Sequence, residues 1–408
     1  MLLVNGALTS IELSQNQLGD EGWGAIFAAI CGNKDSKIKS MYASGQNIGP
    51  AGVKLIAEAL RTSVTGSLTN LSLAENKLEE EGTNAICEAL EQNTTLKELD
   101  ISGRYGYEGN IGGSAGAKHV AKMLGVNGVL KVTNLLGNKL DAESAKTLAE
   151  VAKQKGISLC GIQRDQTTAD FYSQGLNPPD AILLASDLSQ AVVTCGLTSL
   201  DLSNNALCGV NAFGGTYTAE GITAIADALR VNGGLTSIDV RHNNIAGDGA
   251  VQLAAAVLGN LKIEIFNEIP MKEMRANSLT ELDLNGKYVG VEGGMVVAGL
   301  IPVMGGLTSI NLSRNQMCGL DAYGQGTYTA EGIIVIADAL RVNGGLTALN
   351  LSNNDLEDKG VRAICKAIQS NKETKLTSLN FKNNRISSVG ANAVAAMVAV
   401  TGALTKIE

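Results

Sequence analysis

The stretch LTSLDLSNNAL at residues 197–207 decides the fold, because close variants of it recur along the whole chain. LTNLSLAENKL (68–78) and LTALNLSNNDL (346–356) repeat the same spacing of apolar residues and the same Asn-x-Leu ending. Such short apolar/polar alternation predicts a β-strand with one buried face. Twelve copies of the pattern can be placed, and an incomplete thirteenth begins at Leu404. The twelve begin at Leu8, Ile38, Leu68, Leu96, Leu130, Gln166, Leu197, Leu235, Leu279, Leu307, Leu346 and Leu376.

The second half of each repeat changes period. In EGTNAICEAL (81–90), apolar residues lie three, four, seven and eight positions after Gly82, which is the spacing of one face of an α-helix. Ten of the twelve repeats have glycine at the position of Gly82, so we expect the chain to pass close to a neighbour there. Neither the strand nor the helix can bury its apolar face alone, so neighbouring repeats must stack.

A strand and a full helix at this spacing resemble the leucine-rich repeats of the ribonuclease-inhibitor-like class. That class includes ribonuclease inhibitor, the Ran GTPase-activating protein and the repeat tails of nucleotide-binding immune receptors. The resemblance covers nearly the whole chain and implies a single α/β solenoid over residues 1–408. Parallel strands would line its concave face, and helices would cover its convex face. The matching residues are structural, so the resemblance implies little about function.

Composition excludes several classes of protein. The net charge of −8 argues against a nucleic-acid-binding surface. No apolar run reaches the roughly 18–20 residues of a membrane span, and the first residues lack the features of a signal peptide. The seven cysteines follow no metal-binding or disulfide spacing, which favours the cytoplasm or another reducing compartment. Phosphate-loop and zinc-protease motifs are absent, so we expect neither an enzyme nor a cofactor or metal site.

The asparagine of the repeat is expected to turn inward and bond the backbone of adjacent repeats. Eight of the twelve repeats keep it. Arg104 and Lys287 replace it in two others, and neither side chain has an acceptor atom. We therefore expect the regular turn to be rebuilt near both residues.

Insertions interrupt the repeats at 104–115, 157–180, 208–219, 261–278 and 318–330. Three of these lie between strand and helix and carry aromatic residues suited to partner binding, although each ring could instead plug its own loop. The aromatic candidates are Tyr105, Tyr107, Phe213, Tyr217, Tyr323 and Tyr328. GTYTAEGI occurs at both 215–222 and 326–333, which duplication of a block of repeats explains. The other two insertions precede strands and are expected to fold back on their own repeats.

The exposed position between the inward leucines is often acidic. Strands stack about 4.8 Å apart, so these carboxylates would form a nearly continuous strip that favours a basic partner. The alternative is a solvated face typical of this repeat class. The residues of the expected strip are Asp100, Asp170, Asp201, Asp239 and Asp283.

These features favour a non-catalytic scaffold that binds a basic protein or peptide and neither nucleic acid nor membrane. One alternative is a GTPase activator like the Ran-directed member of the class, although that member has an acidic C-terminal tail not found in this chain. Another is the sensing part of a larger receptor. Because LTKIE (404–408) ends in mid-strand, we expect further chain or another subunit to cover the ends.

Overall fold

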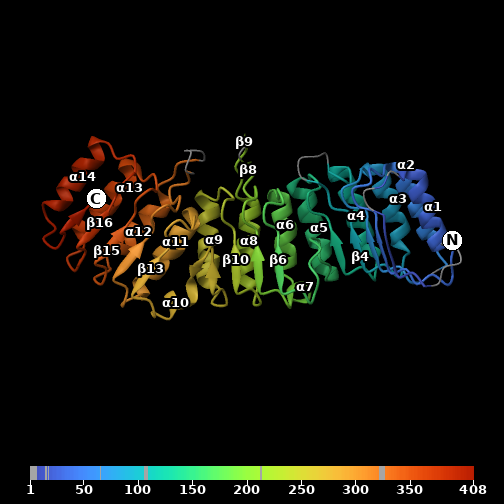
Figure 1. Cartoon of the computed structure of the whole chain (residues 1–408), viewed down its shortest axis with the longest axis horizontal. Helices are drawn as coiled ribbons and strands as arrows, with labels where there is room; N and C mark the ends of the chain where they lie inside the picture. The colour runs from blue at the N-terminus through green and yellow to red at the C-terminus, as the bar shows by residue number, and fades with distance from the viewer. Residues whose placement is uncertain are drawn as a thin grey trace. The chain divides into compact units, whose positions relative to one another are not determined.

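A short strand begins two residues after every expected repeat start, including Leu404, which confirms the repeat pattern (Figure 1). The computed structural model describes residues 7–13, 16, 18–64, 66–104, 109–211, 214–320 and 327–408. The strands of the repeats are β1 (Ser10–Glu12), β2 (Ser40–Tyr42), β3 (Asn70–Ser72), β4 (Glu98–Asp100), β5 (Val132–Asn134), β6 (Thr168–Asp170), β7 (Ser199–Asp201), β10 (Ser237–Asp239), β13 (Glu281–Asp283), β14 (Ser309–Asn311), β15 (Ala348–Asn350), β16 (Ser378–Asn380) and β17 (Lys406–Ile407).

Helices alternate with these strands, as the change of period predicts. The helices are α1 (Gly19–Cys31), α2 (Pro50–Arg61), α3 (Glu79–Glu91), α4 (Gly113–Val126), α5 (Ala142–Lys155), α6 (Pro178–Leu188), α7 (Ala191–Thr194), α8 (Glu220–Val231), α9 (Gly247–Gly259), α10 (Met271–Arg275), α11 (Gly290–Leu300), α12 (Glu331–Leu340), α13 (Glu357–Ser370) and α14 (Ser388–Val398), with a 3₁₀ turn, η2, at Ile301–Val303. The remaining strands, β8 (Val210–Asn211), β9 (Gly214–Gly215), β11 (Ile265–Phe266) and β12 (Ile269–Pro270), lie in insertions.

The chain divides into two compact units, and a single solenoid over residues 1–408 stays a prediction. Unit 1 comprises residues 1–166 and 174–196, and unit 2 comprises 167–173 and 197–408. Unit 1 holds the sheet β1-β2-β3-β4-β5. Unit 2 holds two five-stranded sheets, β6-β7-β10-β11-β12 and β13-β14-β15-β16-β17. Successive repeat strands within each sheet are parallel, and a layer of successive helices packs beside them, so each unit is an α/β leucine-rich-repeat solenoid (Figure 1).

The core lies between the strands and the helices. The middle residue of most repeat strands is buried and its two neighbours are half-buried or exposed, as in β7, where Leu200 is 1% exposed. In α3 the buried residues include Ile86, Ala89 and Leu90, three of the four that the spacing predicts. The fourth, Ala85, is only half-buried, and Cys87 is buried in addition. The buried face of α3 is thus shifted slightly from the one that the apolar spacing predicts, toward Cys87.

Close backbone contact explains the glycine before the helical stripe. A Cβ atom at Gly116 would lie 1.7 Å from the carbonyl oxygen of Ile111. At Gly332, it would lie 2.7 Å from the carbonyl oxygen of Met317. Both contacts are with rigid backbone, so no side chain fits at either position.

The repeat asparagines form a buried ladder between neighbouring repeats. The Asn76 side chain accepts hydrogen bonds from the backbone N–H groups of Gln46 (2.9 Å) and Ile48 (3.0 Å). Its amide donates to the carbonyl oxygens of Ala43 (2.8 Å) and Leu73 (3.0 Å). One side chain therefore satisfies backbone groups of two adjacent turns. The same buried placement recurs at Asn138, Asn205, Asn243, Asn315, Asn354 and Asn384.

The turn near Arg104 is rebuilt with an asparagine from the enlarged loop, as expected. Asn110 is 1% exposed, donates to the carbonyl oxygens of Leu73 (2.8 Å) and Ser102 (3.2 Å), and accepts from Leu78 N–H (3.3 Å). Asn138 in turn accepts from the N–H of Asn110 at 2.8 Å. The ladder therefore continues through this insertion by way of a residue six positions after Arg104.

Both insertions that precede strands pair with the strand of the repeat before them. β11 pairs in parallel with β10, and β12 pairs with β11 in the antiparallel sense. Asn267, which follows β11, accepts from the N–H of Val240 at 2.9 Å and so extends the contact between β10 and this insertion. In unit 1, Ser158 forms a parallel bridge with Val132 of β5. The insertion of unit 2 thus contains the short strand of a shortened repeat, and that of unit 1 contributes isolated bridges at the same place in a shortened repeat.

Removal of one ladder asparagine should destabilise the protein strongly. Asn76→Ala leaves several buried backbone groups unsatisfied, so the free energy of unfolding should fall by about 3 kcal/mol. Asn84→Ala is the matched control, because that side chain lies at the surface of α3 and bonds only Glu88; its effect should stay below about 0.5 kcal/mol. Denaturant unfolding of both variants measures the difference, and equal losses would contradict a stabilising role for the ladder.

Candidate functional site

The repeat strands from β4 to β16 end in Asp or Asn, and this side chain closes a local turn. Asp201 accepts hydrogen bonds from the backbone N–H (2.8 Å) and hydroxyl (2.6 Å) of Ser203. Asn311 bonds Ser313 in the same way, at 3.2 and 2.7 Å. Either side chain supplies the oxygen that the turn requires. The turn therefore explains why Asp and Asn both occur at this position. The turn does not require the negative charge of Asp.

Three of the expected acidic residues lie side by side in unit 2. The strand register pairs Asp170 with Asp201, and Asp201 with Asp239, on β6, β7 and β10. Neighbouring strands are about 4.8 Å apart, so the three carboxylates are close neighbours on the face away from the helices. Asp170 is exposed, whereas Asp201 and Asp239 are half-buried.

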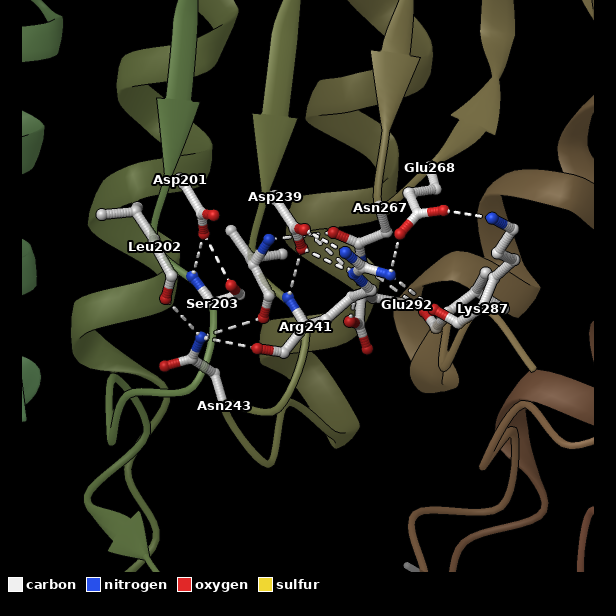
Figure 2. Close-up of polar contacts among 12 residues, drawn as sticks. Asp201, Leu202, Ser203, Asp239, Arg241, Asn243, Asn267, Glu268, Lys287 and Glu292 are labelled. Carbon is white, nitrogen blue, oxygen red and sulfur yellow. Dashed lines mark hydrogen bonds and ion pairs between the residues drawn. The ribbon is translucent and has the colours of Figure 1, made fainter. Parts of the chain in front are cut away.

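Arg241 neutralises one end of this row. Figure 2 shows its guanidinium between Asp239 and Glu268. Nε lies 2.9 Å from each oxygen of Asp239, and Nη1 lies 2.6 Å from Glu268 Oε1 and 2.9 Å from the carbonyl oxygen of Lys287. The Lys287 ammonium also binds Glu268, and this hydrogen bond lowers the pKa of Glu268. The uncompensated charge of the row therefore lies at Asp170 and Asp201.

The expected continuity from Asp239 to Asp283 is wrong. The strand beside β10 is β11, and Asp283 ends β13, the first strand of the next sheet. The neighbour of Asp239 is therefore the uncharged Asn267, which is buried. The fifth residue of the expected strip, Asp100, lies in unit 1, where it bonds Ser102 and Ser72.

A buried carboxyl group lies beneath the Arg241 network. Glu292 of α11 is 3% exposed, and its Oε1 accepts from the side-chain amide of Asn267 at 3.0 Å (Figure 2). Burial raises the pKa of Glu292 to about 8. The same asparagine bonds Val240 and therefore connects Glu292 to the strand that leads into Arg241. At neutral pH the Glu292 side chain is mainly protonated.

Unit 1 contains a related arrangement at its own shortened repeat. Asp187 of α6 is fully buried and accepts from the Ser158 hydroxyl (2.7 Å) and from the N–H groups of Leu159 (2.8 Å) and Cys160 (3.1 Å). Burial raises its pKa to about 7. In both units, a helix carboxyl group therefore satisfies polar groups of a shortened repeat that lacks the regular turn.

Two of the six aromatic candidates can be described, and both attach their loops to the next repeat. The Tyr217 hydroxyl donates to the carbonyl oxygen of Ala246, and the Tyr328 hydroxyl donates to that of Leu356 at 2.8 Å. The ring of Tyr217 remains 42% exposed. Burial raises the pKa of Tyr217 to about 12. The other candidates, Tyr105, Tyr107, Phe213 and Tyr323, lie outside the described residues.

Several residues of this region could not be assigned from the sequence. The contacts of Asn267 with Val240 and Glu292 have no signal in the repeat pattern. The apolar residues on either side of Glu292 in the sequence do not indicate that its carboxyl group is buried. In the part of the chain that the structure describes, no group of three or more His, Cys, Asp or Glu residues could hold a metal ion. None of the described helices has both the length and the apolar character needed to cross a bilayer.

Comparison with known proteins matches parts of the chain to leucine-rich repeats, in agreement with the fold. The family described as "Leucine Rich repeat" matches residues 7–27, 235–254, 346–365 and 372–395. The chain is 32% identical over 163 residues to human NACHT, LRR and PYD domains-containing protein 13, covering 40% of this chain and 14% of that protein. It is 26% identical over 205 residues to pig (Sus scrofa) ribonuclease inhibitor, covering 49% of this chain and 40% of the inhibitor.

A third relative extends over more of the chain. Protein CARMIL of Dictyostelium discoideum is 27% identical over 333 residues, which cover 71% of this chain and 30% of CARMIL. The chain thus spans well under half the length of each of these three relatives.

The raised pKa of Glu292 predicts a pH dependence of stability. An unfolded glutamate has a pKa near 4.5, so between about pH 5 and pH 8 the folded protein holds a proton that the unfolded chain releases. The free energy of unfolding should therefore fall as pH rises through this range. Glu292→Gln, which imitates the protonated side chain, should reduce this fall by about 2 kcal/mol or more. Denaturant unfolding at several pH values measures it, with the exposed Glu281→Gln as control. An unchanged slope in Glu292→Gln would contradict the assignment.

Proposed function

Because this chain is a leucine-rich-repeat protein of the ribonuclease-inhibitor-like class, we propose that it is a non-catalytic protein-binding scaffold. Its partner contacts the exposed strand ends of unit 2 and the loops that follow them. The observation that carries this proposal is the row of in-register carboxylates on β6, β7 and β10. A repeat surface of this kind offers a wide, rigid contact area for a protein partner.

The charge of the row supports a partner with a basic surface. Within the described residues, the Asp170 side chain accepts one hydrogen bond, from the N–H of Tyr172, and Asp201 accepts from Ser203. Neither bond removes negative charge. Arg241, in contrast, already compensates Asp239. We therefore assign the attraction of a basic segment chiefly to Asp170 and Asp201. Asp239 and Asp283 of the same unit contribute less.

The loop tyrosines would contribute at the edge of this surface. Their hydroxyl bonds to Ala246 and Leu356 hold the rings in fixed positions. An aromatic ring that is already held loses little entropy when a partner packs against it. Tyr217 and Tyr328 therefore serve both as local supports and as proposed contact residues.

The thiols support a reducing compartment for this protein. All seven cysteines are free, and six of them are buried. Burial raises the pKa of buried thiols such as Cys208 and Cys318, each to about 12. Such thiols react slowly, and none of the seven takes part in a disulfide.

Removing the two uncompensated carboxylates tests the strand-end surface. Asp170→Asn combined with Asp201→Asn should weaken binding of a labelled oligolysine peptide about tenfold at low salt. The melting temperature should stay unchanged, because Asn makes the same turn at Asn311. The control is Asp227→Asn with Asp338→Asn, which removes equal charge from α8 and α12. Fluorescence anisotropy measures binding; an equal loss in the control would mean that only net charge matters.

A second test addresses the tyrosines. Once a protein partner has been captured with the intact chain, Tyr217→Ala combined with Tyr328→Ala should weaken its binding by about 2 kcal/mol or more. The matching Phe variants keep both rings and should bind nearly as well. Tyr42→Ala, which removes a 44% exposed ring in unit 1, is the control. Isothermal titration measures each affinity. Equal affinity of the wild type and the double Ala variant would limit these tyrosines to supporting their own loops.

A further inference from the structure

We propose that a polar pocket in the C-terminal part of unit 2 binds a carboxylate of an acidic peptide segment, with Arg314 as the anchoring residue. The pocket has a volume of about 580 Å³ and is lined by Tyr288, Arg314, Gln316, Asn353, Asp355 and Arg385, among others. This inference rests on the proposed function as a protein-binding scaffold. It adds a second surface of opposite preference to the acidic row on β6, β7 and β10.

The pocket is built from residues that flank ladder asparagines. Arg314 and Gln316 flank Asn315, Asn353 and Asp355 flank Asn354, and Asn383 and Arg385 flank Asn384. All six flanking residues have left-handed backbone conformations, with φ between 52° and 59°. These conformations are uncommon for residues other than glycine, and here they accompany the buried asparagine bonds.

The ladder holds this lining rigidly. Asn354 accepts from the N–H of Asn315 at 2.9 Å, and Asn384 accepts from the N–H of Asn354 at 3.0 Å. Because the central asparagine of each turn points inward, its two neighbours are available to line the pocket. Three consecutive repeats therefore present paired side chains from fixed backbone positions, which reduces the entropy cost of binding.

Most polar groups of the pocket are already paired, and one cation is not. Arg385 binds Asp355 at 2.7 Å, and the side-chain amide of Asn383 donates to Asn353 at 3.1 Å. Arg314 is exposed, and within the described residues its guanidinium has no hydrogen bond or ion pair. The lining side chains therefore carry a net charge of about +1, located at Arg314.

This arrangement suits a single carboxylate. A guanidinium offers two parallel N–H donors that match the two oxygens of a carboxylate. The hydroxyl of Tyr288, which is 41% exposed, and the amide of Gln316 provide further donors. A dianionic phosphate would be repelled more strongly by Asp355. Because the whole chain carries −8, binding of an acidic peptide depends on short-range contacts such as this one.

Two variants with opposite expected effects test the pocket in the full chain. The probe is a short fluorescein-labelled oligoglutamate peptide, with oligoglutamine of equal length for comparison. Arg314→Asn should weaken oligoglutamate binding about tenfold. Asn fits the left-handed conformation, as Asn353 and Asn383 show. Asp355→Asn removes the opposing charge and frees Arg385, so it should tighten binding about threefold or more.

The control is Arg341→Gln, which removes an equal charge directly after α12, where Arg341 binds Asp338. It should leave the affinity unchanged. Equal affinity in wild type and Arg314→Asn, or an equal loss in Arg341→Gln, would overturn the proposal. So would displacement of the peptide by inorganic phosphate at lower concentration than by glutamate.

The oligolysine measurement separates this proposal from the proposed function. If oligolysine binding depends on Asp170 and Asp201 while oligoglutamate binding ignores Arg314, only the pocket is rejected. If oligoglutamate binding depends on Arg314 while oligolysine binding ignores both aspartates, the pocket is supported and the acidic row is rejected.

Discussion

The buried asparagine ladder is the interaction on which the rest of this structure depends. Each repeat strand is only a few residues long, and the chain must then turn sharply toward its helix. That turn leaves backbone groups that neither strand nor helix can satisfy, and a buried unpaired group is costly. Asn76 and its equivalents satisfy these groups in two repeats at once. The ladder therefore stabilises each turn and also sets its distance from the next.

Where the regular turn is missing, a buried Asp or Glu side chain accepts hydrogen bonds from the polar groups of the shortened repeat. Asp187 accepts three hydrogen bonds from the shortened repeat of unit 1, and Glu292 bonds the asparagine of the shortened repeat of unit 2. A carboxyl group held away from water ionises reluctantly. The irregular repeats are consequently also the parts of the fold whose stability responds to pH near neutrality.

The sequence predicts the repeat starts well because strand and helix periods recur every few tens of residues, so every strand of the pattern was expected. It predicts much less about contacts that join degenerate repeats. Glu292 and Asn267 are separated by 25 residues, and their contact depends on β11 lying beside β10. The same pairing separates Asp239 from Asp283. Alignment of the repeats alone predicts that these two residues are neighbours. The pairing of Arg241 with both Asp239 and Glu268 likewise depends on the fold.

At Asn243, Asn315, Asn354 and Asn384, left-handed residues lie on both sides of the ladder asparagine and separate stability from recognition within a single tripeptide. The central residue is committed to the backbone, whereas its neighbours are charged in one repeat and neutral in the next, as the Arg-Asn-Gln and Asn-Asn-Asp segments at 314–316 and 353–355 illustrate. The two flanking residues of each such turn can therefore be substituted while the buried asparagine, which stabilises the fold, is kept. Because these turns recur in successive repeats, they are suitable positions at which to redesign the binding specificity of the scaffold.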